Sequence, residues 1–101
     1  MTLYDICMEI ARVENGLAYG QIQFHYDNMM CAMKPGHPAD ILDDIFCDVG
    51  NELCFNPQAE IPTSQLKEML EELKEFAAAF RISELDHAIE ALTAYLSADQ
   101  Q

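Results

Sequence analysis

The sequence predicts an all-α fold: a single domain of four to five helices over residues 1–101, ending in an antiparallel αα-hairpin. Two observations favour this class. Apolar residues recur at three- and four-residue spacing through most of the chain, and Gly and Pro residues separate the resulting segments. A length of 101 residues is enough to bury one modest core. The alternative is an α+β fold with a small β-hairpin near residues 20–33.

The first helix is expected over residues 3–14. Thr2 suits the N-cap, because its hydroxyl can accept a hydrogen bond from an amide of the first turn. Asn15-Gly16 predicts the end of the helix, because Gly readily adopts the left-handed conformation that ends helices. The apolar face comprises Leu3, Ile6, Cys7, Ile10, Ala11 and Val13.

Residues 17–34 support two predictions. Helical spacing links a set of apolar residues that Lys34-Pro35-Gly36 would end. Between Gln21 and Tyr26, however, polar and apolar residues alternate, and Asp27-Asn28 suits a hairpin turn. The spacing favours a helix, and the hairpin remains the alternative. The helical set is Ile22, Tyr26, Met29, Met30 and Met33.

A further helix is expected to begin near residue 39, just after Pro38. Gly50 either ends this helix or costs it about 1 kcal/mol relative to Ala. Residues 56–62 predict a loop. The apolar arc of the helix comprises Ile41, Leu42, Ile45, Phe46, Val49 and Leu53.

The αα-hairpin is predicted over residues 63–97. Thr63 or Ser64 is expected to cap its first helix, and Ser83 with Asp86 resembles a capping box that opens the second. Two amphipathic helices with a very short connection become antiparallel neighbours. Their apolar positions are Leu66, Met69, Leu70, Leu73, Phe76, Ala77, Phe80, Leu85, Ala88, Ile89, Leu92, Tyr95 and Leu96.

The charge balance limits the classes of partner. The chain has 18 acidic and 5 basic residues, for a net charge of −13. At this charge, repulsion between the chain and other anions excludes direct binding to nucleic acid and to anionic membranes. Basic protein surfaces, metal cations or simple solubility remain as explanations of the acidity. No signal peptide or membrane-spanning apolar run is evident. The four cysteines lie inside apolar-patterned segments, which indicates reduced thiols and a cytoplasmic location.

Catalytic and metal-binding motifs are absent from the sequence. It contains no nucleophile elbow, phosphate-binding loop, dinucleotide fingerprint or calcium-loop pattern. Cys47 and Cys54 are seven residues apart, too far for one tetrahedral zinc ion. Met29, Met30, Cys31 and Met33 form a soft-ligand cluster, but Met at helical spacing is typical of a core or an interface. We therefore expect a non-enzymatic protein with no cofactor and no dedicated metal site.

Acidic residues instead form two rows on predicted helices. The first contains no Lys or Arg, and only Lys67 and Lys74 soften the second. Residues four apart on a helix are neighbours, and like charges there cost a few tenths of a kcal/mol per pair. Solvated helices usually alternate signs at this spacing, so the rows suit a surface that binds basic groups. The rows are Asp40, Asp43, Asp44, Asp48 and Glu52, then Glu68, Glu71, Glu72 and Glu75.

Cys47 falls among the carboxylates on the helical wheel, opposite the apolar arc. A thiol is seldom placed in open water, so this side is expected to be covered by a partner or by a second subunit.

In length, acidity and helical pattern, with these two rows, the chain resembles small phage-encoded inhibitors such as anti-CRISPR proteins and other DNA mimics. The resemblance is to the class and rests on no family-specific motif. It implies that carboxylates occupy Lys and Arg sites on a nucleic-acid-binding complex and exclude its DNA or RNA, in the cytoplasm of the host.

The sequence thus favours a non-enzymatic acidic interaction module that inhibits such a partner. Two alternatives remain: a structural or adaptor subunit whose acidity serves solubility, and a small thiol- or metal-dependent protein. A homodimer is also compatible with the sequence. The residues expected to supply an apolar or dimer contact are Tyr26, Met29, Met30, Met33 and Cys47.

Overall fold

The fold is all-α, as the sequence predicts. The computed structural model describes residues 1–99, in which no strand occurs, so the alternative with a β-hairpin near residues 20–33 is wrong. The elements are α1 (Leu3–Ala18), α2 (Asn28–Met33), α3 (Pro38–Phe55), α4 (Thr63–Phe80), a single 3-10 turn η1 (Ser83–Leu85) and α5 (Asp86–Asp99).

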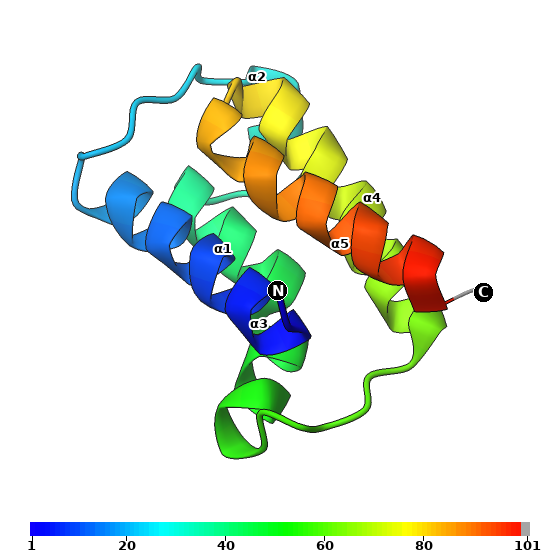
Figure 1. The fold of residues 1–101 in the computed structure, drawn as a ribbon. Coiled ribbons are helices and arrows are strands. Elements are labelled where there is room, and N and C mark those ends of the chain that lie inside the picture. Colours follow the sequence, from blue (N-terminus) through cyan, green and yellow to red (C-terminus); the bar gives the residue numbers. More distant parts are fainter. Residues whose placement is uncertain (100–101) are drawn as a thin grey trace.

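The four long helices form an antiparallel bundle. α1 packs against α3 and α5, and α4 packs against the same two helices. Each long helix runs opposite to the next long helix in the chain (Figure 1). Each therefore has two neighbours and keeps one outward strip. The strips of α3 and α4 carry the two predicted acidic rows.

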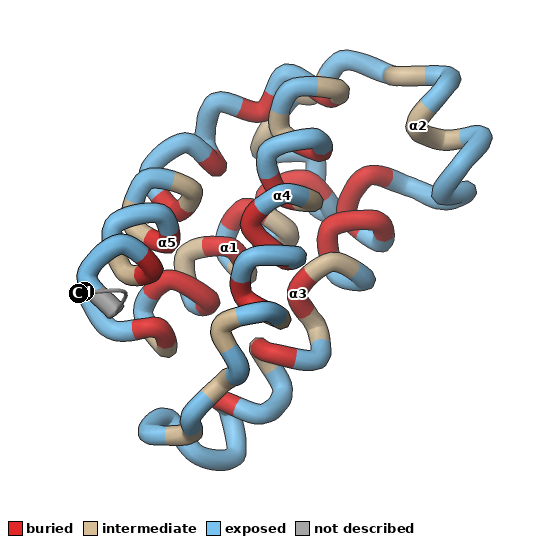
Figure 2. The backbone as a smooth tube through the Cα atoms, turned by 90° about the vertical axis from the view of Figure 1, so that its right-hand side faces the viewer, coloured by how far each residue is buried: buried red, intermediate tan, exposed pale blue. Residues whose placement is uncertain are grey.

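The core lies along the bundle axis and consists of apolar side chains only, within the part of the chain that the structure describes. Buried positions recur on the inward side of each long helix, whereas α2 has none (Figure 2). Each fully buried Leu, Ile or Phe contributes about 1.5–3 kcal/mol. All residues of the predicted α3 arc are buried except Ile45, which is half-buried.

Helix α1 runs four residues beyond the predicted end, because Gly16 is not its stop signal. The stop is Gly20, which has φ 73°. The N–H of Gly20 donates to the carbonyl of Leu17 at 3.4 Å, and that of Gln21 donates to the carbonyl of Gly16 at 2.8 Å. This pair of bonds is the Schellman ending. Of the two glycines four residues apart, Gly20 ends the helix, and the predicted stop at Asn15-Gly16 is wrong.

Gly16 is required for close packing instead. A Cβ added there would lie 2.6 Å from Cγ1 of Ile22. The chain that leaves α1 therefore folds back over the helix, and Ile22 packs where a side chain at position 16 would stand.

The segment after α1 is mostly non-helical, so the helix predicted within residues 17–34 is right only for Asn28–Met33. Phe24 packs edge-on against Phe80, with ring centroids 6.3 Å apart. The backbone N–H of His25 donates to the carbonyl of Phe80 at 2.7 Å. These contacts hold the segment at the end of the bundle where α4 ends (Figure 1). Apolar Ile22 and Phe24 alternate with polar residues because both apolar side chains pack inward, and not because the segment is a strand.

Helix α3 begins as predicted and continues through Gly50 to Phe55. Its N-cap is His37, whose ring Nδ1 accepts from the N–H of Ala39 at 3.1 Å. His is not a usual capping residue, so this role could not be predicted from the sequence.

The predicted caps of the αα-hairpin are wrong. Pro62 occupies the N-cap of α4, which has no side-chain cap, and Ser83 begins η1 instead of capping α5. Arg81 ends α4 in the left-handed conformation, at φ 55° and ψ 52°, which turns the chain directly into η1.

Gly16→Ala should lower the free energy of unfolding, although Ala is the better helix former by about 1 kcal/mol, because the new Cβ displaces Ile22. In an Ile22→Ala background the same change should raise it by up to about 1 kcal/mol. Urea unfolding of the four chains measures this coupling. Equal effects of Gly16→Ala in both backgrounds would show that Ile22 does not set the requirement for glycine.

Candidate functional site: an acidic groove between α3 and α4

The two predicted acidic rows meet along one groove, of about 220 Å³, between α3 and α4. We call it the acidic groove. Its walls carry carboxylates from both helices, and its floor is apolar. The lining residues are Asp44, Ile45, Asp48 and Val49 from α3, and Gln65, Glu68, Met69 and Glu72 from α4.

Helical geometry explains this arrangement. Ile45, Val49 and Met69 face the seam between the two helices, where the first is half-buried and the others are buried. Asp44 and Asp48 each precede one of these apolar residues in the chain, so the side chains that flank the seam are carboxylates. Packing α3 on α4 therefore brings like charges from two helices to one surface.

Counter-charges at the groove are few. Lys34 Nζ lies 3.7 Å from an oxygen of Glu72, and Lys74 pairs with Glu71 at 3.6 Å, outside the groove lining. All four side chains are substantially exposed, and such pairs contribute about 0.2–1 kcal/mol each. Helix α3 contains no Lys or Arg. Within residues 1–99, no cation lies within 4 Å of the carboxylates of Asp44, Asp48 or Glu68.

Four of the nine predicted partner-binding carboxylates line this groove, and the other five do not. Asp40 and Glu52 are exposed elsewhere on α3, and Glu71 and Glu75 are exposed on α4. Asp43 turns toward α1 and lines a second groove between α1 and α3. The acidic surface thus continues from the acidic groove across the exposed side of α3.

Glu14 belongs to this surface and was missed by the sequence analysis. It is half-buried on α1. Burial, the charge of Asp43, a hydrogen bond with Asp43 and the charge of Asp40 together raise the pKa of Glu14 from 4.5 to about 7. A signal existed: Cys7, Ile10 and Glu14 follow three- and four-residue spacing, so a carboxyl continues an apolar stripe.

Cys47 is half-buried within the chain itself, in the groove between α1 and α3. Its cover by a partner or a second subunit stays a prediction. The Sγ of Cys47 lies 3.9 Å from Oδ1 of Asp48 and 4.0 Å from the carbonyl oxygen of Asp44. Burial and the nearby charges of Asp48, Asp43 and Asp44 raise the pKa of this thiol. A protonated thiol is a poor nucleophile, so this arrangement does not provide an activated cysteine.

The three histidines do not converge. His87 is exposed on α5, and its Nδ1 lies 2.7 Å from Oε1 of Glu9, which links α5 to α1. His37 caps α3, and His25 is exposed. Among residues 1–99, no three His, Cys, Asp or Glu side chains are grouped so that they could hold a metal ion.

The α2 residues expected to make an apolar contact are largely exposed. Met29 is 76% exposed, Met33 75% and the preceding Tyr26 60%, whereas Met30 is half-buried. α2 is joined to the acidic surface through Lys34, which follows its last residue.

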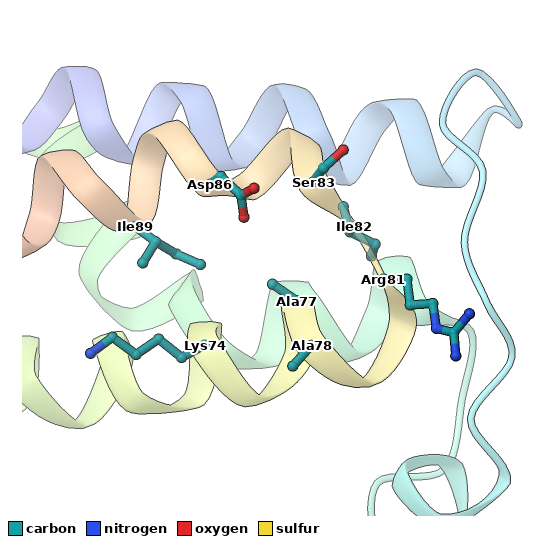
Figure 3. A pocket seen from close by; sticks show the side chains of 8 residues that line it. All are labelled: Lys74, Ala77, Ala78, Arg81, Ile82, Ser83, Asp86 and Ile89. Carbon is teal, nitrogen blue, oxygen red and sulfur yellow. The ribbon is translucent and has the colours of Figure 1, made fainter.

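A broad open depression of about 520 Å³ lies between the end of α4 and the start of α5 (Figure 3). It collects two of the chain's five cations, Lys74 and Arg81, together with Ser83 and Asp86. The two cationic side chains point away from one another in Figure 3, and Lys74 already pairs with Glu71. The depression therefore does not present a converging set of groups for an anion.

Comparison of the chain with protein-family models, with curated proteins and with solved structures gives no match. None of the helices in residues 1–99 is long and apolar enough to cross a membrane.

The raised pKa of Glu14 should make stability depend on pH. The folded chain binds this proton more tightly than the unfolded chain, so the stabilisation is fully present below pH 4.5 and is lost as pH rises through about 7. Water screens a half-buried group, so the loss between pH 5 and 8 should be on the order of 1 kcal/mol. Urea unfolding of the wild type and of Glu14→Gln measures it.

Glu14→Gln should remove this part of the pH dependence, whereas Glu90→Gln, on the exposed side of α5, should leave it unchanged. Identical pH profiles for the wild type and Glu14→Gln would contradict the raised pKa of Glu14.

Proposed function

We propose that the chain is a non-enzymatic acidic inhibitor that occupies a basic, nucleic-acid-binding surface of a partner protein or complex. One observation carries the proposal: four carboxylates from two helices line one groove, with Lys34 as the single cation paired to any of them within residues 1–99. Such a surface attracts Lys and Arg side chains and repels nucleic acid and other anions.

The spacing of the charges supports mimicry of a nucleic acid. Carboxylates four residues apart on a helix lie about 6 Å apart along its axis. Each wall of the acidic groove carries such a pair, Asp44 with Asp48 and Glu68 with Glu72. This spacing is of the same order as that of phosphates along one strand of DNA. Two such rows allow basic side chains to meet carboxylates from both sides.

The physical consequences follow from charge. A net charge of −13 speeds the encounter with a basic partner, and salt slows it by screening. Because long-range attraction contributes more to on-rate than to lifetime, a smaller apolar contact is needed to hold the complex. The exposed side chains of Tyr26, Met29 and Met33 are available for that contact.

Competition with DNA tests the proposal. The immobilised chain should retain a nucleic-acid-binding protein from its native cell extract, and a duplex of about 20 base pairs should release it. The affinity of the isolated partner should fall steeply with salt. Asp44→Asn/Asp48→Asn/Glu68→Gln should weaken binding at least about tenfold, because three of the four carboxylates in the acidic groove lose their charge.

The matched control is Glu60→Gln/Glu84→Gln/Glu90→Gln, which removes three exposed charges that do not line the acidic groove. It should bind nearly as well as the wild type. A partner that DNA cannot displace, or equal losses in the two triple variants, would contradict inhibition through this groove. In that case acidity serves solubility, as expected for an adaptor subunit.

A further inference from the structure

A second groove lies between α1 and α3, on the other side of the exposed face of α3. It has a volume of about 110 Å³ and is mainly apolar. We call it the thiol groove, because three of the chain's four cysteines line it. Its residues are Tyr4, Cys7, Met8 and Ala11 from α1, and Asp43, Phe46, Cys47, Gly50, Asn51, Leu53 and Cys54 from α3.

Gly50 helps to form this groove. A glycine inside a helix costs about 1 kcal/mol relative to Ala, yet α3 continues through it. A Cβ at this position would lie 3.2 Å from Cδ2 of Phe46 and would crowd the ring that forms part of the groove wall. The absence of a side chain therefore leaves the ring of Phe46 and the space beside it free.

The thiols act here as apolar surface. Cys7 is 5% exposed, and burial followed by the charge of Cys54 raises its pKa to about 11. A neutral thiol behaves as a small apolar group. Among the residues that line the groove, Met8 is 37% exposed and Cys54 is exposed as well. Apolar groups are thus exposed to solvent at the thiol groove.

The charges beside the thiol groove determine what can cover it. Asp43 lines it, and Asp44 and Asp48 follow on the same exposed face of α3. α3 has no Lys or Arg, and Arg12 is the one basic residue of α1. A second copy would bring two chains of charge −13 and two aspartate rows together. A partner with basic residues beside an apolar one is therefore favoured over a second copy.

We infer that the thiol groove receives one apolar side chain from a basic amphipathic helix of the partner, while Lys or Arg residues on that helix contact Asp43, Asp44 and Asp48. This inference rests on the proposed function and specifies the form of the partner's contact. An amphipathic helix suits the site because its apolar side chains share one face at three- and four-residue spacing, with basic side chains beside that face.

Two synthetic 14-residue helical peptides of equal charge test the inference, one built from Leu and Lys and the other from Ala and Lys. The Leu–Lys peptide should bind about tenfold more tightly, measured by fluorescence anisotropy. It should also slow the alkylation of Cys47 and Cys54 by N-ethylmaleimide, because its Leu side chains cover them. The Ala–Lys peptide should leave alkylation unchanged.

Met8→Lys should lower the affinity for the Leu–Lys peptide at least tenfold, because it places a cation at the thiol groove. Ala94→Lys adds the same positive charge on the exposed side of α5, outside both grooves, and should have little effect. Equal affinity for both peptides with unprotected thiols overturns the inference but leaves charge-driven binding intact.

A second copy would cover the groove instead if two results occur together. Without peptide, thiol protection would rise with protein concentration, and the protein would have a dimeric mass. These results would overturn the inference. The proposed function fails separately, when the partner is not released by DNA.

Discussion

The contact between α3 and α4 is the constraint on which the acidic surface depends. Its apolar floor, formed by Ile45, Val49 and Met69, draws the helices together, and the burial of such groups stabilises the bundle by kilocalories per side chain. The carboxylates beside these residues are carried into the same groove. Their repulsion is smaller, a few tenths of a kcal/mol per pair, so packing dominates and the charges remain close.

Helix α3 serves two surfaces because it has a helix packed on each side. Toward α4 it presents Asp44 and Asp48, and toward α1 it presents Asp43 and Cys47. The exposed strip between the grooves has no positive charge. An approaching basic segment thus meets carboxylates on one side of α3, and carboxylates beside an apolar hollow on the other.

Much of the fold could be predicted from the sequence, because amphipathic spacing is a local property. The apolar arcs of the four long helices are confirmed by burial. Features that depend on tertiary contact could not be predicted. Gly16 and Gly20 look alike in sequence, and only the position of Ile22 distinguishes a packing glycine from a terminating one. Likewise, nothing local identifies His37 as a cap.

The candidate site was predicted in part for the same reason. Periodicity identified the two acidic rows, but it could not show that Asp44 and Asp48 face Glu68 and Glu72 across one groove, because that depends on which helices are neighbours. Glu14 was overlooked because its partner Asp43 lies 29 positions further along the chain, on another helix.

The most direct test is the salt dependence of stability for Asp44→Asn/Asp48→Asn/Glu68→Gln and for its control Glu60→Gln/Glu84→Gln/Glu90→Gln. If the acidic groove stores like-charge repulsion, the first variant should gain more stability than the control at about 10 mM salt, by on the order of 1 kcal/mol. This difference should vanish near 1 M salt, where the Debye length is about 3 Å. The account would be contradicted if, at low salt, the acidic-groove variant gains no more stability than its control.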